Sequence, residues 1–319
     1  MDFKTELKNY QNIVNRELEK YVRKDECIEK VLNSAMEYSL MAEGKRLRPI
    51  LVIATYKLFK ENIEECFPYA VAIEMVHNFS LIHDDLPGID NDDFRHGKPT
   101  NHKQFNEATA ILAGDGLLNN AYMVIANDFK NNEIKSVNVN NSNSINYPGN
   151  LDNSKHSITM LNKKIRIFNE FSKAIDRMIA GEYIDTEYEG KQVLEENLEY
   201  MDENKTGALL KLSVRMGAIL AECSEEDIER LTSYAKKIGL AFQIKDDILS
   251  EEGDEKILGK PVGNDKKLNK CTYVSKYGLN EAKNKLNKLI EGAIKDIEIY
   301  DEKAEFLKEL AIYIKEREK

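Results

Sequence analysis

The spacing of apolar residues constrains the fold of this 319-residue chain more than any other feature. Apolar side chains recur at helical period in most segments, as in Ile50, Ile53, Ala54 and Leu58, whereas the alternation typical of strands is scarce. Only 6 Pro and 16 Gly interrupt the chain, which leaves few turn signals. The sequence therefore predicts an all-α protein, built as a bundle of long helices.

One polar stretch interrupts this pattern between two segments of the same helical character. Nine of the 23 residues from 131 to 153 are Asn, and a Pro-Gly pair lies near the end of the stretch. Such a composition cannot bury enough apolar surface to order itself. A linker between two domains is the alternative interpretation. Because both flanks have the same pattern, we expect one domain over residues 1–319 with an inserted loop at about 131–157.

Charge and cysteine content exclude several classes of function. The formal net charge of -10 repels phosphate backbones, so we expect no nucleic-acid partner. The four cysteines are far apart and form no C-x-x-C pair, which argues against a structural zinc site and a disulfide framework. No apolar run approaches the ~20 residues that span a bilayer. We expect a cytoplasmic protein with reduced thiols and no membrane anchor.

Two acidic clusters each follow an apolar segment. Five aspartates lie between Asp84 and Asp93, and a second segment ends in the adjacent pair Asp246 and Asp247. Neighbouring carboxylates repel each other and are costly to bury, so each cluster is either a solvated helix end or a site for a divalent cation. Hard oxygen ligands without soft ligands nearby favour Mg²⁺ over zinc. On a helix, Gln243 shares a face with Asp247 one turn away.

Basic residues accompany these clusters in a way that a metal site alone does not require. They are Lys45, Arg46, Arg48, Arg95, Lys205, Lys260 and Lys270. Surface ion pairs, worth ~0 to 1 kcal/mol each, are the plain alternative. A site that combines Mg²⁺-binding carboxylates with phosphate-binding cations is what a diphosphate substrate requires.

Six short segments carry a family resemblance that covers the chain from about Lys45 to its C-terminus. In order, they are GKRLRP, DDLPGIDNDD, GKPTNH, NKTGAL, FQIKDD and GKPVGND. With these motifs the chain resembles the trans-isoprenyl diphosphate synthases, and most closely the bacterial farnesyl diphosphate synthases, also called geranyltranstransferases. The resemblance implies helices around a central substrate cavity (the isoprenoid synthase fold) and a homodimer.

The implied reaction is Mg²⁺-dependent prenyl transfer from an allylic diphosphate (dimethylallyl or geranyl) to isopentenyl diphosphate, giving mainly farnesyl diphosphate. Alternatives within the fold are a geranylgeranyl diphosphate synthase and a terpene cyclase. Lys45, Arg48 and His77 argue against a cyclase, which has no use for a second diphosphate site. A non-catalytic subunit of a two-component prenyl synthase is a further alternative, which Ser250 and His96 favour and the complete first cluster disfavours.

The resemblance also implies roles for individual residues. The metal ligands are Asp84, Asp85, Asp90, Asp246 and Asp247. The allylic diphosphate contacts Arg95, Lys205, Gln243, Lys260 and Lys270, and isopentenyl diphosphate contacts Lys45, Arg48, His77 and His96. Thr206 lies at the reacting centre, where it helps to stabilise developing positive charge.

Four positions depart from the family pattern. Ser250 replaces the third aspartate of the second cluster, and His96 replaces an arginine that contacts isopentenyl diphosphate. Glu182 stands where Gln is usual, and Asp202 where His is usual. We expect the chemistry to survive these changes at a reduced rate.

Product length depends on the floor of the substrate pocket. In an ideal helix Phe79 points ~140° away from Asp84 and Ser80 only ~40°, so periodicity alone favours Ser80. The resemblance favours Phe79, because synthases that stop at fifteen carbons usually carry an aromatic residue at this position. We therefore expect Phe79 to close the floor.

Overall fold

The computed structural model describes residues 2–22, 28–137, 150–188, 191, 195–252 and 272–318. Up to residue 137 the elements are α1 (Phe3–Glu19), α2 (Lys30–Leu40), α3 (Leu47–Lys57), η1 (Ile63–Cys66), α4 (Phe67–Asp84), β1 (Phe94–Arg95), β2 (Lys98–Pro99), α5 (Asn101–Gln104) and α6 (Glu107–Val137). They continue with α7 (Asn150–Glu187), α8 (Glu195–Lys205), α9 (Gly207–Leu220), α10 (Glu225–Glu252), α13 (Tyr273–Tyr277), α14 (Leu279–Ile297), η2 (Glu298–Ala304) and α15 (Glu305–Glu316). The predicted all-α fold is confirmed.

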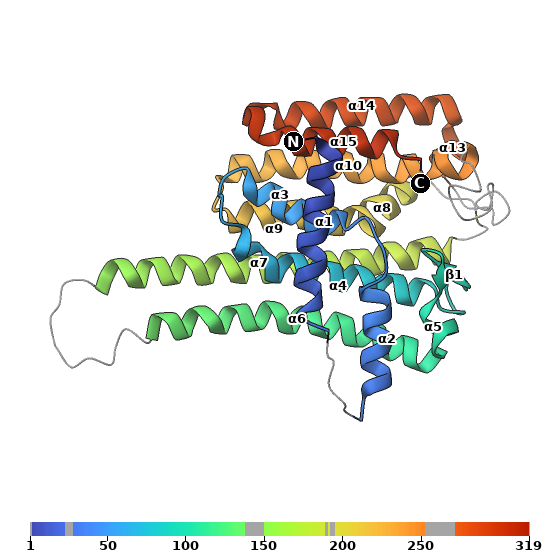
Figure 1. Cartoon of the computed structure of the whole chain (residues 1–319). Coiled ribbons are helices and arrows are strands. Elements are labelled where there is room, and N and C mark those ends of the chain that lie inside the picture. Colours follow the sequence, from blue (N-terminus) through green and yellow to red (C-terminus); the bar gives the residue numbers. More distant parts are fainter. Residues whose placement is uncertain are drawn as a thin grey trace.

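The long helices run roughly along one direction, and α1 and α2 cross them (Figure 1). Helices α14 and α15 lie along one side of the bundle, and α6 and α7 lie along the opposite side. α4 packs on α6, α3 on α9, and α10 on both α9 and α14. α8 in turn packs on α7, α9 and α10.

Helix α4 is the central helix because it is apolar on nearly every face. Its residues from Tyr69 to Val76 are all buried, whereas an outer helix such as α14 buries only one stripe, which includes Leu286 and Ile290. A single connected core extends from Leu7 in α1 to Ile314 in α15. The organisation of residues 1–319 as one domain stays a prediction, which this continuous core supports.

Close backbone contact joins α3 to α9. A Cβ atom at Gly217 would lie 2.4 Å from the carbonyl oxygen of Val52, so only glycine fits there. At the other side of the bundle, α6 and α7 extend into the Asn-rich segment from both ends, to Val137 and from Asn150. Residues 138–149 of the predicted inserted loop lie outside the described residues.

Within the described residues, no helix combines the length and the apolar composition needed to cross a bilayer.

Candidate active site

The first acidic cluster occupies the end of α4 and the loop that follows. α4 ends at Asp84, and Asp85 is its C-cap residue. The backbone N–H of Asp90 donates to the carbonyl oxygen of Asp84 at 2.9 Å, so the loop turns back over the helix end. The C-terminus of a helix carries partial negative charge, which makes this an unfavourable place for carboxylates unless cations join them.

Arg95 on β1 is the cation that pairs with Asp85. Its Nε donates to Asp85 Oδ1 at 2.7 Å, and its Nη2 lies 2.6 Å from the same oxygen. The tight turn at His96 and Gly97, with φ of 51° and 76°, reverses the chain between β1 and β2 and keeps Arg95 against the helix end. Arg95 was predicted to hold the allylic diphosphate, and the structure places it at the first cluster.

Asp84 lies where its negative charge is disfavoured. Burial raises the pKa of Asp84 to about 8; the charges of Glu182 and Asp90 add to this, while Lys205 and Arg95 oppose it. Carboxylates that repel one another in a partly buried site are relieved by a bound divalent cation, so the residues present fit Mg²⁺.

A metal ion here would need ligands from outside the protein. Within the described ranges, no group of three or more His, Cys, Asp or Glu side chains is placed to hold an ion alone. Mg²⁺ commonly binds through one or two carboxylates together with waters and substrate phosphates. The geometry therefore suits an ion that arrives with a phosphorylated substrate.

Lys205 stands at the end of α8, between two carboxylates of α7. Its Nζ lies 2.5 Å from Asp185 Oδ2 and 3.0 Å from Glu182 Oε1. Gly181 makes this contact possible, since a Cβ atom there would lie 2.2 Å from the backbone nitrogen of Lys205. Burial lowers the pKa of Lys205, but Asp185 and Glu182 outweigh it and the pKa is raised. Lys205 therefore carries its positive charge at neutral pH.

The second acidic cluster lies in the last two turns of α10. Arg317, one residue beyond α15, donates from Nη2 to Asp246 Oδ1 at 2.7 Å and to the carbonyl oxygen of Phe242 at 2.9 Å. Its guanidinium carbon also lies 4.0 Å from the centroid of the Phe242 ring. The side chain of Arg317 is only 2% exposed, so the C-terminal end of the chain is fixed against this cluster.

Asp247, beside Asp246, has protein donors on both carboxylate oxygens. Gln243 Nε2 donates to Oδ1 at 3.1 Å, and the backbone N–H of Tyr273 donates to Oδ2 at 2.8 Å. Thr206 in turn donates from Oγ1 to Gln243 Oε1 at 3.3 Å. The predicted site residues Thr206, Gln243 and Asp247 therefore form one hydrogen-bonded row that connects the junction of α8 and α9 to α10.

Arg48 and His77, two of the residues predicted to hold isopentenyl diphosphate, lie beside the first cluster. Burial lowers the pKa of Arg48 to about 10, while the charges of Glu74 and Asp84 act in the opposite direction. Burial lowers the pKa of His77 as well, and the positive charges of Arg48 and Arg95 add to this. His77 is therefore neutral at pH 7, so that one ring nitrogen can donate a hydrogen bond and the other can accept one.

Lys45 and Arg46 are adjacent in sequence, but their surroundings differ. The Nζ of Lys45 lies 5.6 Å from the centroid of the Phe242 ring, which places Lys45 next to the second cluster. Arg46 is 5% exposed, and its Nη1 donates to Glu74 Oε1 at 2.7 Å. Its Nη2 donates to the carbonyl oxygens of Leu40 and Ala42, at 2.9 and 2.8 Å. The Arg46 guanidinium therefore has a structural role.

Asp202, where the family usually has His, is buried between the clusters. It is 3% exposed, and among the described residues its Oδ2 has no hydrogen-bond partner. Burial raises the pKa of Asp202 well above its ordinary value, and the charges of Asp247 and Asp185 add to this. Asp202 is therefore close enough to Asp247 in the second cluster, and to Asp185 on α7, for their charges to act on it.

Phe79 is packed inside the bundle on the side of α4 that faces α6. It is 7% exposed, and its ring meets the ring of His83 edge-on, with centroids 4.8 Å apart. His83 Nε2 lies 3.0 Å from the carbonyl oxygen of Ile111 on α6. The orientation expected from the helical wheel, away from Asp84, agrees with this packing against α6.

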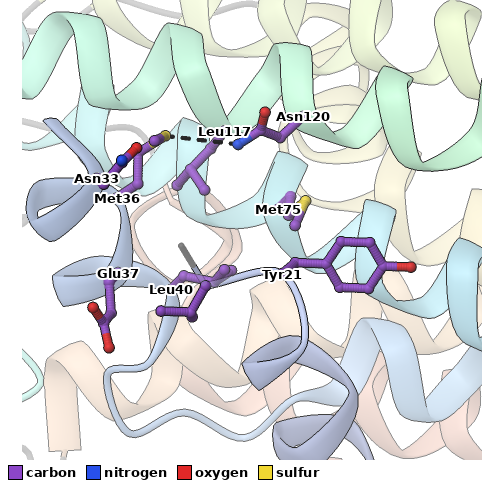
Figure 2. A pocket seen from close by; sticks show the side chains of 9 residues that line it. Tyr21, Asn33, Met36, Glu37, Leu40, Met75, Leu117 and Asn120 are labelled. Atoms are coloured by element: carbon purple, nitrogen blue, oxygen red, sulfur yellow. Dashed lines mark hydrogen bonds between the residues drawn. The ribbon is translucent and has the colours of Figure 1, made fainter. Parts of the chain in front are cut away.

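A small cavity lies one turn beyond Phe79, between α2, α4 and α6. Figure 2 shows Met75, four residues before Phe79, together with Met36 and Leu117 around this space. The cavity measures about 20 Å³, which is room for about one water molecule. As it stands, the cavity does not accommodate an isoprene unit.

Two predicted site residues, Lys260 and Lys270, lie outside the described residues. Conversely, three site residues were not predicted: Asp185, Phe242 and Arg317. Asp185 lies within four residues of Glu182 and could have been found as the second acidic residue on that helix face. Arg317 has no local signal, because its partner Asp246 is 71 residues away.

Comparisons with known proteins agree with this geometry. The family model described as Polyprenyl synthetase matches residues 29–310. The farnesyl diphosphate synthase of Bacillus subtilis (strain 168) is 42% identical over 264 residues, which cover 82% of this chain and 80% of the relative. The geranylgeranyl diphosphate synthase of Cyanophora paradoxa is 39% identical over 286 residues, which cover 89% and 86%.

Solved structures give the same result. The geranylgeranyl pyrophosphate synthetase of Pyrococcus horikoshii Ot3 matches with a TM-score of 0.82 and 28% identity, over 99% of this chain and 98% of that one. A farnesyl or geranylfarnesyl diphosphate (FPP/GFPP) synthase from Zymomonas mobilis matches with a TM-score of 0.79 and 30% identity, over 98% of each chain. The sequence motifs, the helical bundle and these relatives together show that the chain belongs to the polyprenyl synthetase family, as a short-chain trans-prenyltransferase.

Proposed function

We propose that this protein is a farnesyl diphosphate synthase, which adds isopentenyl diphosphate to dimethylallyl and then to geranyl diphosphate. The observation that carries the proposal is the position of two cations at the acidic clusters. Arg95 pairs with Asp85 in the first cluster, and Lys205 is followed directly by Thr206, whose hydrogen bonds lead through Gln243 to Asp247 in the second. One diphosphate would bind between the acidic clusters and another beside them. A terpene cyclase would need only the diphosphate site between the clusters.

Bound Mg²⁺ would supply the positive charge that stabilises the departing diphosphate. Asp84, Asp90 and Asp246 would hold the ions, and Asp85, paired with Arg95, would support the first cluster. Lys205 and Arg95 would release their carboxylate partners and bind diphosphate oxygens instead. Asp247 has a supporting role in this scheme, because Gln243 and Tyr273 already use its two oxygens.

The reaction itself requires no protein nucleophile. The C–O bond of the allylic diphosphate breaks, and both electrons leave with the diphosphate. The double bond of isopentenyl diphosphate attacks the allylic cation, and loss of a proton from the new cation gives the lengthened allylic product. Thr206 lies beside Lys205 and Gln243, where its hydroxyl oxygen would face the developing positive charge. The buried helices keep water from the cation.

Phe79 and the tight packing beyond it support a fifteen-carbon product. A longer chain would have to displace the Phe79 ring and then enter a space that holds about one water molecule. Truncation to alanine removes the ring and leaves a cavity that an apolar tail can fill.

The test is product length. Purified protein is incubated with Mg²⁺, labelled isopentenyl diphosphate and each allylic primer in turn, and products are separated by chain length. We expect farnesyl diphosphate from the wild type and twenty carbons or more from Phe79→Ala. Phe306→Ala, at a comparably buried position (8% exposed) in α15, is the matched control and should keep the wild-type product. An unchanged product from Phe79→Ala would place the floor elsewhere.

A geranylgeranyl diphosphate synthase is the second candidate, since relatives with that name share almost the same identity. It predicts twenty-carbon product from the wild type in the same assay. A non-catalytic subunit predicts no condensation with any primer.

We further propose that the protein forms a homodimer through α6 and α7. These adjacent helices on one side of the bundle (Figure 1) expose large apolar side chains: Ile111, Leu112, Met123, Leu161, Ile165, Ile179 and Tyr183. Several such residues on two neighbouring helices are typical of a protein interface. Light scattering should give twice the chain mass of 36.6 kDa for the wild type and the monomer mass for Leu112→Lys.

A further inference from the structure

We propose that Glu182 sets the magnesium concentration at which this protein binds an allylic diphosphate, because its carboxylate competes with the diphosphate for the Lys205 ammonium. The inference rests on the proposed function and concerns a residue of the same site. It assigns Glu182 a positioning role that acts through Lys205.

Glu182 cannot easily move away from Lys205. The backbones of α7 and α8 touch at Gly181, where a Cβ atom would lie 2.2 Å from the nitrogen and 2.7 Å from the Cα of Lys205. Glu182 follows directly in the sequence, and its Oε1 lies 3.0 Å from Lys205 Nζ. Its side chain is 19% exposed and that of Lys205 is 26% exposed, so water screens this pair only in part.

Glu182 is the second carboxylate on one ammonium group. Asp185 Oδ2 lies closer to Lys205 Nζ, at 2.5 Å, and by itself neutralises the lysine. Among the described residues, the ion pair with Lys205 is the one ion pair of Glu182. Arg95, the other nearby cation, is occupied by Asp85. Among the described residues, Glu182 therefore adds a second negative charge to a lysine that Asp185 already neutralises.

The geometry around Lys205 carries the inference, and the directions of the pKa shifts agree with it. Burial is the largest cause of the raised pKa of Asp84, and the charge of Glu182 is the next largest. Glu182 itself has a raised pKa, first from burial and then from Asp185 and Asp90, against the opposing effect of Lys205. An incoming diphosphate thus meets, in the part of the site that the structure describes, two carboxylates that share the Lys205 ammonium.

Magnesium would reverse this balance. Each ion that binds with the diphosphate brings two positive charges, after which Lys205 can turn from Glu182 to a phosphate oxygen. A neutral amide at position 182 would remove the competitor and keep the side-chain shape, so less Mg²⁺ would be needed for the same diphosphate affinity.

The experiment measures diphosphate binding without turnover. Inorganic diphosphate is titrated into the protein by calorimetry at a series of Mg²⁺ concentrations, for the wild type, Glu182→Gln and the control Glu187→Gln. Glu187 lies on the same helix and pairs with Lys191 at 2.6 Å, on the exposed surface. Circular dichroism and thermal melting establish that all three proteins are folded.

We expect the half-saturating Mg²⁺ concentration for diphosphate binding to fall roughly three- to tenfold in Glu182→Gln, as suits the loss of one partly screened ion pair. Glu187→Gln should match the wild type. An unchanged value in Glu182→Gln overturns the proposal. A higher value also overturns it and would make Glu182 a metal ligand.

A kinetic measurement separates this proposal from the proposed function. At low Mg²⁺ the KM for geranyl diphosphate should fall in Glu182→Gln by the same factor as in calorimetry. If the wild type does not condense isopentenyl diphosphate at any Mg²⁺ concentration, the proposed function fails. The calorimetric comparison would still decide the role of Glu182.

Discussion

The two acidic clusters look alike in sequence but are held in opposite ways. Asp85 pairs with Arg95, ten residues away on the first strand of the hairpin that follows α4. Asp246 pairs with Arg317, 71 residues away at the end of the chain. The first cluster is therefore complete once α4 and its hairpin have formed. The second cluster needs α15 to dock before its charge is balanced.

This difference predicts that the two clusters respond alike to the loss of a metal ligand but differently to the loss of a pairing partner. Both clusters are proposed to bind the same diphosphate, so losing a metal ligand from either should be equally harmful to the reaction. Losing a partner should have different effects, because the partners of the second cluster also hold distant parts of the chain together.

The largest expected effect comes from the proposed ligands themselves. Asp84→Asn and Asp246→Asn should each lower kcat by about 10³-fold or more, since each removes charge stabilisation in the transition state. The control is Asp93→Asn, an exposed member of the first loop that pairs with Lys103. Steady-state kinetics with geranyl diphosphate measure the effect. Near-native turnover in either ligand variant would contradict a shared metal site.

Arg317→Met should have a smaller effect, divided between activity and stability. It removes hydrogen bonds to Asp246 and to the carbonyl of Phe242, and contact with the Phe242 ring. We expect a roughly tenfold fall in kcat and a loss of about 1–2 kcal/mol in the free energy of unfolding, discounted because Asp246 is 44% exposed. Urea titration of Arg317→Met and Arg95→Met provides the comparison. A larger loss for Arg95→Met would contradict the distinction drawn between the clusters.

The variant Asp202→Asn tests whether the buried acid Asp202 makes the stability of the protein depend on pH. The raised pKa of Asp202 means that the folded state favours the protonated acid. Its stabilising contribution is therefore complete below about pH 4, the ordinary value, and is lost as pH rises toward the raised pKa. The neutral amide escapes this loss, so its advantage over the wild type should grow between pH 5 and pH 8, by about 1 kcal/mol. Thermal melts across this range measure it, and a constant difference would argue against a buried acid.

The smallest effect is expected at the exposed turn of the first cluster. Burial lowers the pKa of His96, and Arg95, Arg46 and Lys45 add to the shift, so the ring is neutral at pH 7. His96→Arg should lower the KM for isopentenyl diphosphate roughly two- to tenfold at pH 7.5. Wild-type KM should improve as pH falls below about 6.5, whereas the variant should not respond. The same KM in both proteins would show that position 96 does not reach the substrate.

The fold could be predicted from sequence because helical period is a local property. The apolar spacing around Ile50 and Ile53 is sufficient to predict α3. The helical extension of α6 to Val137 was not predicted, since an Asn-rich composition favours turns wherever no neighbouring helix supports the backbone. Figure 1 shows α7 beside α6 along this side of the bundle.

The site was predictable where its residues lie next to one another in sequence. Thr206, Gln243 and Asp247 come together because helix geometry places the last two on one face. Contacts between residues that are far apart in the sequence could not be predicted. Neither the position of Arg317 nor the ring of Phe242 between it and Lys45 follows from any local pattern, because these residues are far apart in sequence.

The buried guanidinium of Arg46 affects how variants of the GKRLRP motif must be interpreted. One side chain joins α2, α4 and the approach to α3, and removing one partner of a buried ion pair typically costs about 3–5 kcal/mol. A screen scored by product formation would therefore group Arg46 with Lys45 and Arg48, although the three positions fail for different reasons. Yield of folded protein separates them: substitutions at Lys45 should leave it intact, while those at Arg46 should reduce the amount of enzyme present and spare the affinity of the molecules that remain folded.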